Sequence, residues 1–303
     1  MIVMKKIGQV LLGIFQVLTY LLINLMVGAL VSIAYSLVKY VQMSSQGITD
    51  YNVALSLILK EFSTSNYMML ASCVISIVAA IVYTVWYNKG YVKGEKTELR
   101  KILTLKNTVI IVLLAISVQI FLITFVSIVE GIKPDWFIQY NELMGKFGIG
   151  TSLQSLLYVA LLGPIVEEML MRGLVLNQMK KVMPFVGANI VQAFLFALLH
   201  GNLIQGSYAF ILGLLFGYVY RKYNSIYSTI LFHVAFNSSG YLFDVIFRGM
   251  DLNSIVIIIA AILSFVFSLL MIWYQFRDGK KDGMYMSDLA ISAEKVIYQQ
   301  EGE

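Results

Sequence analysis

The sequence predicts an all-α, polytopic membrane protein with about eight transmembrane helices and both termini in the cytoplasm. Of its 303 residues, 59% are hydrophobic and only 13% are charged, and the mean hydropathy is +0.80. Soluble domains carry about 25% charged residues. Apolar stretches long enough to cross, or nearly cross, a hydrocarbon core of about 30 Å recur along the chain. They cover approximately 10–38, 67–87, 107–129, 151–179, 186–204, 205–220, 225–247 and 253–276.

The first stretch is too long for the hydrophobic core of a signal peptide, so we expect it to remain as the first transmembrane helix. Between the stretches, most basic residues fall in the loops on the side of the two termini, which the positive-inside rule assigns to the cytoplasm. The net charge of +5 is spread over these loops and therefore indicates topology, not nucleic-acid binding. The single cysteine, Cys73, excludes an intrachain disulfide and a cysteine-based metal cluster.

The polar segment between the first two stretches contains one apolar run, VALSLILKEF, at residues 53–62. This run is compatible with a short interfacial helix and with an ordinary folded loop. No internal repeat is visible, which disfavours the inverted-repeat architecture of many secondary transporters.

Ionisable residues inside the apolar stretches concentrate in the fourth to seventh of them. Glu167, Glu168 and Arg172 lie in the fourth, and the only two histidines of the chain, His200 and His233, lie in the fifth and seventh. A charge near the centre of a bilayer costs about 2.5 to 3.5 kcal/mol on insertion scales. Because both histidines accompany a carboxylate pair in this costly environment, we expect them to form one functional constellation.

Helical spacing gives the two glutamates different surroundings. Glu168 and Arg172 are four residues apart, so they can pair with each other and reduce the cost of burying both charges. Glu167 is rotated by about 100° from Glu168 and needs another partner. Just before them, Gly163 and Pro164 can break the fourth span or open its backbone, and a helix restarted there would bring its positive end near Glu167.

His233 and Asn237 are also four residues apart and present an imidazole and an amide from one helix face. Phe196 and His200 repeat that spacing. Counted at about 1.5 Å per residue from the expected cytoplasmic ends, the depths of Glu167, His200, His233 and Asn237 range from about 12 to 21 Å. We therefore expect four polar groups from three helices to meet at a similar level.

A carboxylate buried with two imidazoles and an amide can hydrolyse an acyl bond without a covalent nucleophile. The carboxylate would act as general base on a water, while an imidazole and the amide would donate hydrogen bonds to the oxyanion. Two histidines and one glutamate are also a catalytic zinc ligand set, so a zinc ion held by Glu167, His200 and His233 stays an alternative. The residues alone do not separate these two chemistries.

Motifs of other intramembrane proteases are absent from the sequence. It contains no His-Glu-x-x-His, no Gly-x-Ser-Gly and no Gly-x-Gly-Asp. Ser238 and Ser239 follow His233, but neither lies three or four residues from it, so serine chemistry is disfavoured.

Three segments in order carry a family resemblance: EEMLMR, FALLH and HVAFN fit Glu-Glu-x-x-x-Arg, Phe-x-x-x-His and His-x-x-x-Asn. In a multi-span protein this ordered set resembles the CAAX protease and bacteriocin-processing family, also called Abi, whose eukaryotic relatives cleave prenylated CAAX proteins. The resemblance covers about residues 150 to 250 and leaves the choice between a metalloprotease and a glutamate-type enzyme open. It implies that Glu167 and His200 activate the water, that His233 and Asn237 stabilise the oxyanion, and that Glu168, Arg172 and Phe196 organise the site.

With this resemblance the chain divides into N-terminal transmembrane helices with polar loops (1–149), a CAAX-protease-like helical core (150–250), a last transmembrane helix (251–276) and a polar cytoplasmic tail (277–303). The expected function is an intramembrane endopeptidase that acts on a peptide or membrane-protein segment in contact with lipid. The alternatives are a catalytically silent scaffold or regulator, such as a bacteriocin-immunity or sensor-kinase partner, and, less favoured, a transporter. The composition favours a bacterial plasma membrane, where prenylated substrates are not expected.

Overall fold

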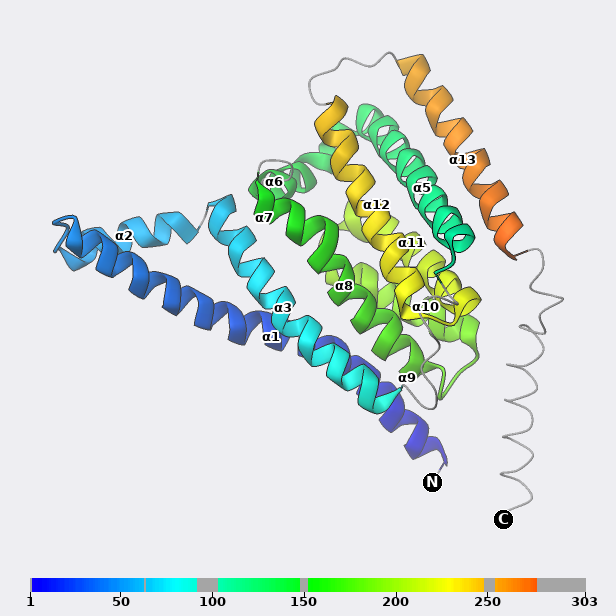
Figure 1. The fold of residues 1–303 in the computed structure, drawn as a ribbon, viewed down its shortest axis with the longest axis horizontal. Coiled ribbons are helices and arrows are strands. Elements are labelled where there is room, and N and C mark those ends of the chain that lie inside the picture. Colours follow the sequence, from blue (N-terminus) through cyan, green and yellow to red (C-terminus); the bar gives the residue numbers. More distant parts are fainter. Residues whose placement is uncertain (1, 63, 92–102, 148–151, 248–253, 277–303) are drawn as a thin grey trace.

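The computed structural model describes residues 2–62, 64–91, 103–147, 152–247 and 254–276, and all regular structure within them is helical (Figure 1). Five of these helices are long and apolar enough to cross a membrane. Several apolar helices of this length identify a multi-pass membrane protein. They are Met4–Ser45, Asn66–Gly90, Leu105–Ile132, Leu203–Tyr223 and Ile255–Tyr274.

The predicted count of eight spans and the cytoplasmic position of the termini are not confirmed. Of the other three predicted spans, one is a composite segment and one has only 15 residues. The third, α12 (Ile226–Phe247), has 22 residues but is not among the helices that are apolar enough to cross a membrane. The expected tail at 277–303 lies outside the described residues.

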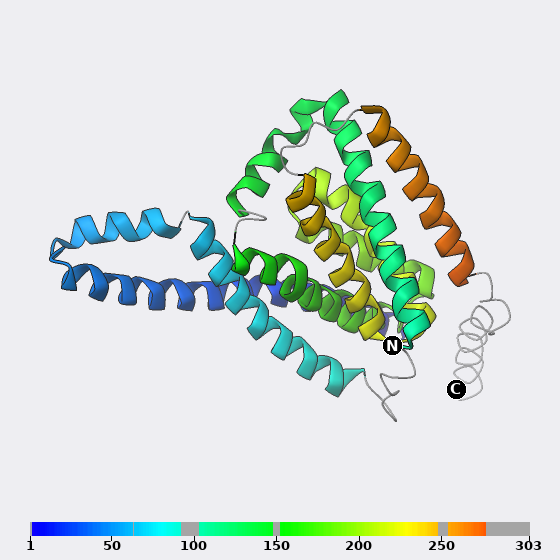
Figure 2. The ribbon, with the colours of Figure 1, turned by 45° about the horizontal axis from the view of Figure 1, so that its top comes forward.

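The N-terminal half forms an extended arm and the outer wall of the bundle. Helix α1 (Ile2–Ser45) is about 66 Å long at 1.5 Å per residue, roughly twice the hydrocarbon thickness. Figure 2 shows α2 (Tyr51–Phe62) folding back along the far end of α1 before α3 (Ser65–Gly90) returns to the bundle. The run at 53–62 is thus a helix. Its Glu61 pairs with Lys39 of α1 at 3.0 Å, and hydrogen bonds from Tyr35 and Lys39 hold the pKa of Glu61 below its ordinary value.

The central segment is a single helical rod that changes its hydrogen-bonding pattern four times. The rod begins with α7 (Leu153–Leu156), passes through a π-helix, α8 and a second π-helix, and ends with α9 (Asn177–Met179). The first π-helix is Leu157–Leu162, α8 is Gly163–Glu168, and the second π-helix is Met169–Leu176. Every residue of the second π-helix is buried, as expected of a segment at the centre of a helical bundle.

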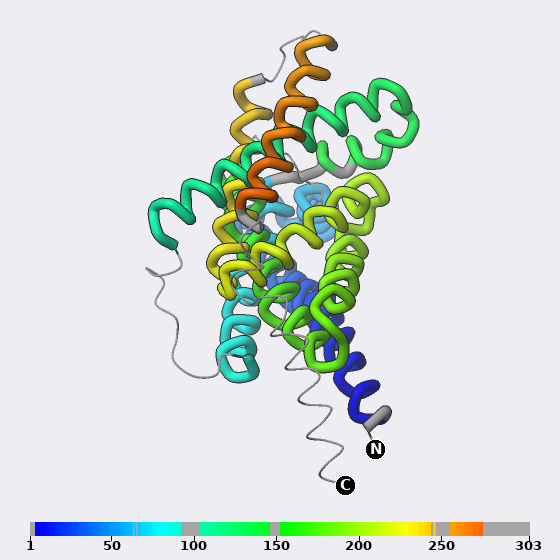
Figure 3. The backbone as a smooth tube through the Cα atoms, turned by 90° about the vertical axis from the view of Figure 1, so that its right-hand side faces the viewer, coloured from blue at the N-terminus to red at the C-terminus, as the bar shows by residue number. Residues whose placement is uncertain are grey.

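The helices that follow pack around this rod. Helix α10 (Phe185–Leu199) and α11 (Leu203–Tyr223) form a hairpin, and Figure 3 shows them side by side at one edge of the bundle. The turn between them needs glycine at Gly201, where φ is +62°, and Asn202 accepts hydrogen bonds from two backbone N–H groups at the start of α11. Helix α12 (Ile226–Phe247) then crosses the rod.

Small residues let α10 and α11 approach closely. A Cβ on Gly213 would lie 2.9 Å from the Cβ of Ala193, and one on Gly217 would collide with the side chain of Asn189. Gly213 and Gly217 form a Gly-x-x-x-Gly pair, the spacing that membrane helices use for close contact. This approach brings the aromatic rings and carbonyl groups of both helices against the rod.

The remaining helices cover the open side of α12. Helix α5 (Leu105–Ile132) packs against both α12 and α13 (Ser254–Phe276). A short 3-10 turn at Pro134–Phe137 and α6 (Ile138–Phe147) follow α5. Together these elements enclose a large cavity against the rod.

Candidate active site

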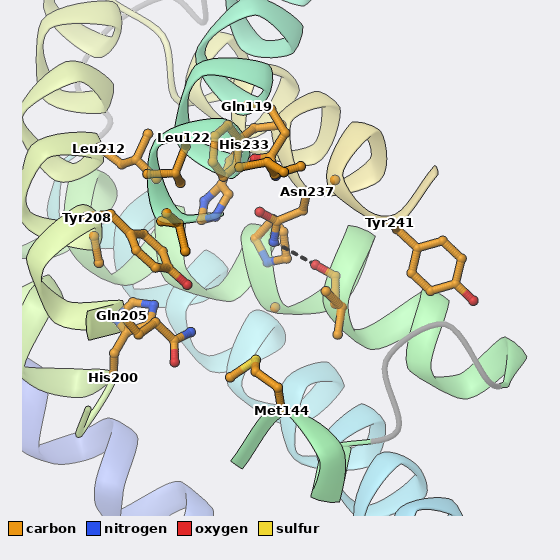
Figure 4. Close-up of a pocket in the computed structure, with 18 of the residues that line it drawn as sticks. Gln119, Leu122, Met144, His200, Gln205, Tyr208, Leu212, His233, Asn237 and Tyr241 are labelled. Carbon is orange, nitrogen blue, oxygen red and sulfur yellow. Dashed lines mark hydrogen bonds between the residues drawn. The ribbon is translucent and has the colours of Figure 1, made fainter. Parts of the chain in front are cut away.

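A cavity of about 1100 Å³ lies between the rod and the helices α5, α11 and α12. Its walls include four of the residues that the sequence singled out: Glu167 from α8, His200 at the end of α10, and His233 and Asn237 from α12. Figure 4 shows His200, His233 and Asn237 around this space. The structure therefore brings together the four side chains that the sequence assigned to catalysis, and Phe196 lines the same cavity.

Glu168 and Arg172 lie behind the cavity wall, fully buried. Arg172 Nη1 donates to Glu168 Oε1 at 2.9 Å, and neither side chain has any exposed surface. The pairing at a spacing of four residues is thus as predicted. A second guanidinium nitrogen, Nη2, donates to the carbonyl of Gly213 in α11 at 3.2 Å, which ties the rod to the hairpin.

Two aromatic rings contact the guanidinium of Arg172 from adjacent sides. The ring centroids of Phe196 and Phe216 lie 4.8 and 4.7 Å from Arg172 Cζ. Cation–π contacts of this kind gain strength where water is excluded. Phe196 therefore contacts both the buried ion pair and the cavity, which agrees with an organising function.

His233 is held between the two glutamates. Its Nδ1 lies 2.8 Å from Glu168 Oε1, and its Nε2 lies 3.7 Å from Glu167 Oε2. The ring of Phe216 packs against the imidazole, with centroids 4.6 Å apart. Because Glu168 accepts from Arg172 through the same oxygen, the ion pair fixes the orientation of His233, and Nε2 faces Glu167.

His200 is oriented by its own helix. Its Nδ1 lies 2.8 Å from the carbonyl oxygen of Phe196, one turn earlier, and the two rings meet edge to face. A carbonyl can only accept, so Nδ1 carries the proton of this hydrogen bond and Nε2 of a neutral ring is an acceptor. Nε2 of His200 is thus the ring nitrogen that is available to accept a hydrogen bond from a molecule in the cavity.

Asn237 compensates for the proline in the rod. In the first π-helix each N–H reaches five residues back, as Gly163 N–H does to the carbonyl of Tyr158. The next donor in this pattern would be Pro164, which has no N–H. The orphaned carbonyl of Val159 instead accepts a hydrogen bond from Asn237 Nδ2 at 2.7 Å (Figure 4). Pro164 therefore opens the backbone without breaking the helix.

A zinc site would need Glu167, His200 and His233 to converge on one point. Within the described ranges, no three His, Cys, Asp or Glu side chains lie in an arrangement that could hold a metal ion. Of the set Glu167, His200 and His233, only His233 and Glu167 are near enough to form a contact, at 3.7 Å. These residues therefore do not fit a three-ligand metal centre as they stand.

Several cavity residues were not singled out by the sequence. Tyr158 belongs to the rod and Tyr208 to α11, whereas Tyr20 and Gln119 come from α1 and α5, outside the three motifs. The early spans contain few polar side chains, and a glutamine near the middle of an apolar span is the one sequence signal that marks α5 as part of the site. The tyrosines carry no such signal, because tyrosine is common in membrane helices of every kind.

Comparison with known families agrees with the geometry. Residues 149–239 match the family described as type II CAAX prenyl endopeptidase Rce1-like. This range includes all three motifs and ends two residues after Asn237. No curated protein and no solved structure matches the chain. Residues 149–239 therefore match the Rce1-like CAAX endopeptidase family, the family that the ordered motifs predicted from the sequence alone.

Proposed function

We propose that the protein is an intramembrane endopeptidase that hydrolyses a peptide bond in a membrane-associated peptide or protein, with Glu167 as the general base. The observation that carries this proposal is the line of contacts from Arg172 through Glu168 and His233 to Glu167. It leads from a fully buried ion pair to a carboxylate at the wall of the cavity. Hydrogen bonds join Arg172, Glu168 and His233, and a 3.7 Å contact between charged or polar atoms joins His233 to Glu167. Such a fixed polar arrangement preorganises a site for charge that develops during the reaction.

In the first step Glu167 takes a proton from a water molecule while the water oxygen attacks the carbonyl carbon of the substrate. His200 Nε2 accepts the other hydrogen of this water and thereby aims it. The carbonyl oxygen becomes an oxyanion. In the second step the bond between carbon and nitrogen breaks, and Glu167 returns its proton to the leaving nitrogen.

The oxyanion receives its hydrogen bonds from α12. Asn237 Nδ2 has two hydrogens, of which one is committed to the carbonyl of Val159 and the other can donate into the cavity. His233 donates from Nε2 when its ring is an imidazolium, and the positive charges of His233 and Arg172 then balance the negative charges of Glu167 and Glu168. The total charge of the site then stays the same while Glu167 is neutralised and the oxyanion forms, so the buried site need not accommodate a new net charge.

We favour the glutamate-type reaction over zinc chemistry because of the donor arrangement. Glu167, His200 and His233 are not arranged as a metal centre in the part of the chain that the structure describes. The position of the site suits a substrate that reaches the cavity from the lipid, and we place it in the cytoplasmic half of a bacterial plasma membrane. In this proposal residues 150–250 are the catalytic core, and the flanking helices complete its walls.

The test compares wild type with Glu167→Ala and His233→Ala, purified in detergent and matched for thermal unfolding, on a library of amphipathic membrane peptides. Products are identified by mass spectrometry, with and without a zinc chelator. We expect wild type to cleave, both variants to lose at least about a hundredfold in rate, and the chelator to have no effect. Cleavage that survives both substitutions would overturn the site. Inhibition by the chelator would support the zinc-dependent mechanism instead. A complete absence of cleavage would favour the alternative that the protein is a scaffold without catalytic activity.

A further inference from the structure

One buried amide in the cavity wall has an unused hydrogen-bonding atom. Gln119 of α5 is 8% exposed and lines the cavity, and among the described residues no group bonds its buried Oε1. An unpaired polar atom in such a place is costly, because neither water nor lipid satisfies it. Gln119 lies outside the segment that matches the family, and neither the motifs nor the proposed reaction gives it a role.

Helix α12 is shaped to receive this amide. A Cβ on Gly240 would lie only 2.5 Å from Gln119 Nε2, so the absence of a side chain there makes the room that the amide occupies. Gly240 follows Asn237 by three residues and His233 by seven, which puts all three on one face of α12. The position on α12 that Gln119 contacts therefore lies about one helical turn, or roughly 5 Å, along the helix from Asn237. Figure 4 shows Gln119 on the same side of the cavity as His233 and Asn237.

A carboxamide pairs naturally with a peptide group, since each has one acceptor and at least one N–H donor in the same plane. Within a cavity whose other walls are largely apolar, such a pair satisfies both partners. We propose that Gln119 binds a backbone amide of the substrate next to the bond that is cut; this inference rests on the proposed function. An extended chain advances about 3.3–3.6 Å per residue, so the amide that Gln119 binds is one or two residues from the scissile carbonyl.

The binding test does not depend on cleavage. N-dodecylacetamide carries one amide on an apolar tail, and dodecyl acetate has the same length but an ester in place of the amide. Each is added to wild type and to Gln119→Met in detergent, and the midpoint of thermal unfolding is measured. We expect the amide to raise the midpoint of wild type more than the ester does, and we expect this difference to vanish in Gln119→Met.

Two further variants make the result specific. Gln16→Met alters another buried glutamine with an unpaired oxygen, in α1 and away from the cavity, and should keep the difference between amide and ester. Gly240→Ala displaces the Gln119 amide without removing it and should reduce the difference, which keeps the test decisive if Gln119→Met fails to fold. Equal shifts for amide and ester on wild type, or a difference that persists in Gln119→Met, would overturn the proposal.

On a peptide that wild type cleaves, Gln119→Met should raise KM at least fivefold and leave kcat within twofold, because the amide holds the substrate and not the reacting atoms. A fall in kcat with KM unchanged would contradict this role. If no peptide is cleaved while the difference between amide and ester is found, the endopeptidase proposal fails and the amide site remains. The two failures are therefore distinguishable.

Discussion

At the scale of single residues, Arg172 supports the other side chains of the site, because it pairs with Glu168 and Glu168 in turn orients His233. It is fully buried, and Glu168 relies on its guanidinium for charge compensation. Replacing Arg172 by Met keeps an unbranched side chain against Phe196 and Phe216 but leaves the Glu168 carboxylate without the guanidinium that pairs with it. We expect a loss of about 3–5 kcal/mol in unfolding free energy. Thermal or denaturant unfolding in detergent measures this change.

A second substitution separates stability from catalysis. Adding Glu168→Met to Arg172→Met removes the uncompensated charge and should recover most of the lost stability. Cleavage should stay at least about a hundredfold below wild type, since His233 then lacks the acceptor that orients its ring. A double variant that regains activity together with stability would show that the ion pair serves only to hold the helices.

At the scale of elements, the rod combines a proline with two π-helices at the site. The pairing of Glu168 with Arg172 was predictable, because it needs only the spacing of four residues. Asn237 was expected at the site, and it lines the cavity. Its bond to Val159 was not predictable, because the sequence does not reveal that the rod changes to a five-residue pattern ahead of Pro164. A prediction that assumes 3.6 residues per turn assigns side chains and backbone groups to the wrong face of the helix wherever such a change occurs.

The bond between Asn237 and Val159 predicts a coupling between two substitutions. In wild type, Asn237→Ala leaves the Val159 carbonyl without a donor and should cost about 1–3 kcal/mol of stability. With Pro164→Ala, residue 164 regains an N–H that can reach this carbonyl, so the same Asn237→Ala substitution should cost clearly less. A double-mutant cycle of unfolding free energies measures this difference. Equal costs in both backgrounds would mean that the proline does not create the need for Asn237.

At the scale of the whole molecule, the cavity is assembled from segments far apart in the chain. Alanine at position 260 of α13 lines it, although α13 lies outside the matched segment and next to α5 (Figure 1). Ala260→Phe should therefore occupy part of the cavity and raise KM at least fivefold. Leu263→Phe adds a similar ring on a side chain that is 64% exposed, and should leave cleavage unchanged. Both are measured by steady-state kinetics on a cleaved peptide, and equal effects of the two rings would argue against a substrate cavity here.

Composition and hydropathy were sufficient to predict a helical membrane protein, and the ordered motifs were sufficient to predict the family that residues 149–239 match. The number of spans was harder, because α10 has 15 residues and the rod is a composite of short helices. Hydropathy recognises apolar runs, but it cannot tell a lipid-facing helix from one that is buried among other helices. For the same reason the contribution of α5 to the cavity was missed. A single glutamine in an apolar helix is equally compatible with a packing contact between helices, and only the structure shows that Gln119 lines a cavity.

The most direct test of the account replaces one carboxylate. Glu167→Gln keeps the shape of the side chain but removes the base, and Glu142→Gln makes the same change on an exposed glutamate of α6. Cleavage of the best peptide from the library is followed by mass spectrometry in lipid vesicles. We predict that Glu142→Gln matches wild type and that Glu167→Gln is at least about a hundredfold slower with unchanged thermal stability. A Glu167→Gln variant that cleaves at the wild-type rate would contradict the mechanism.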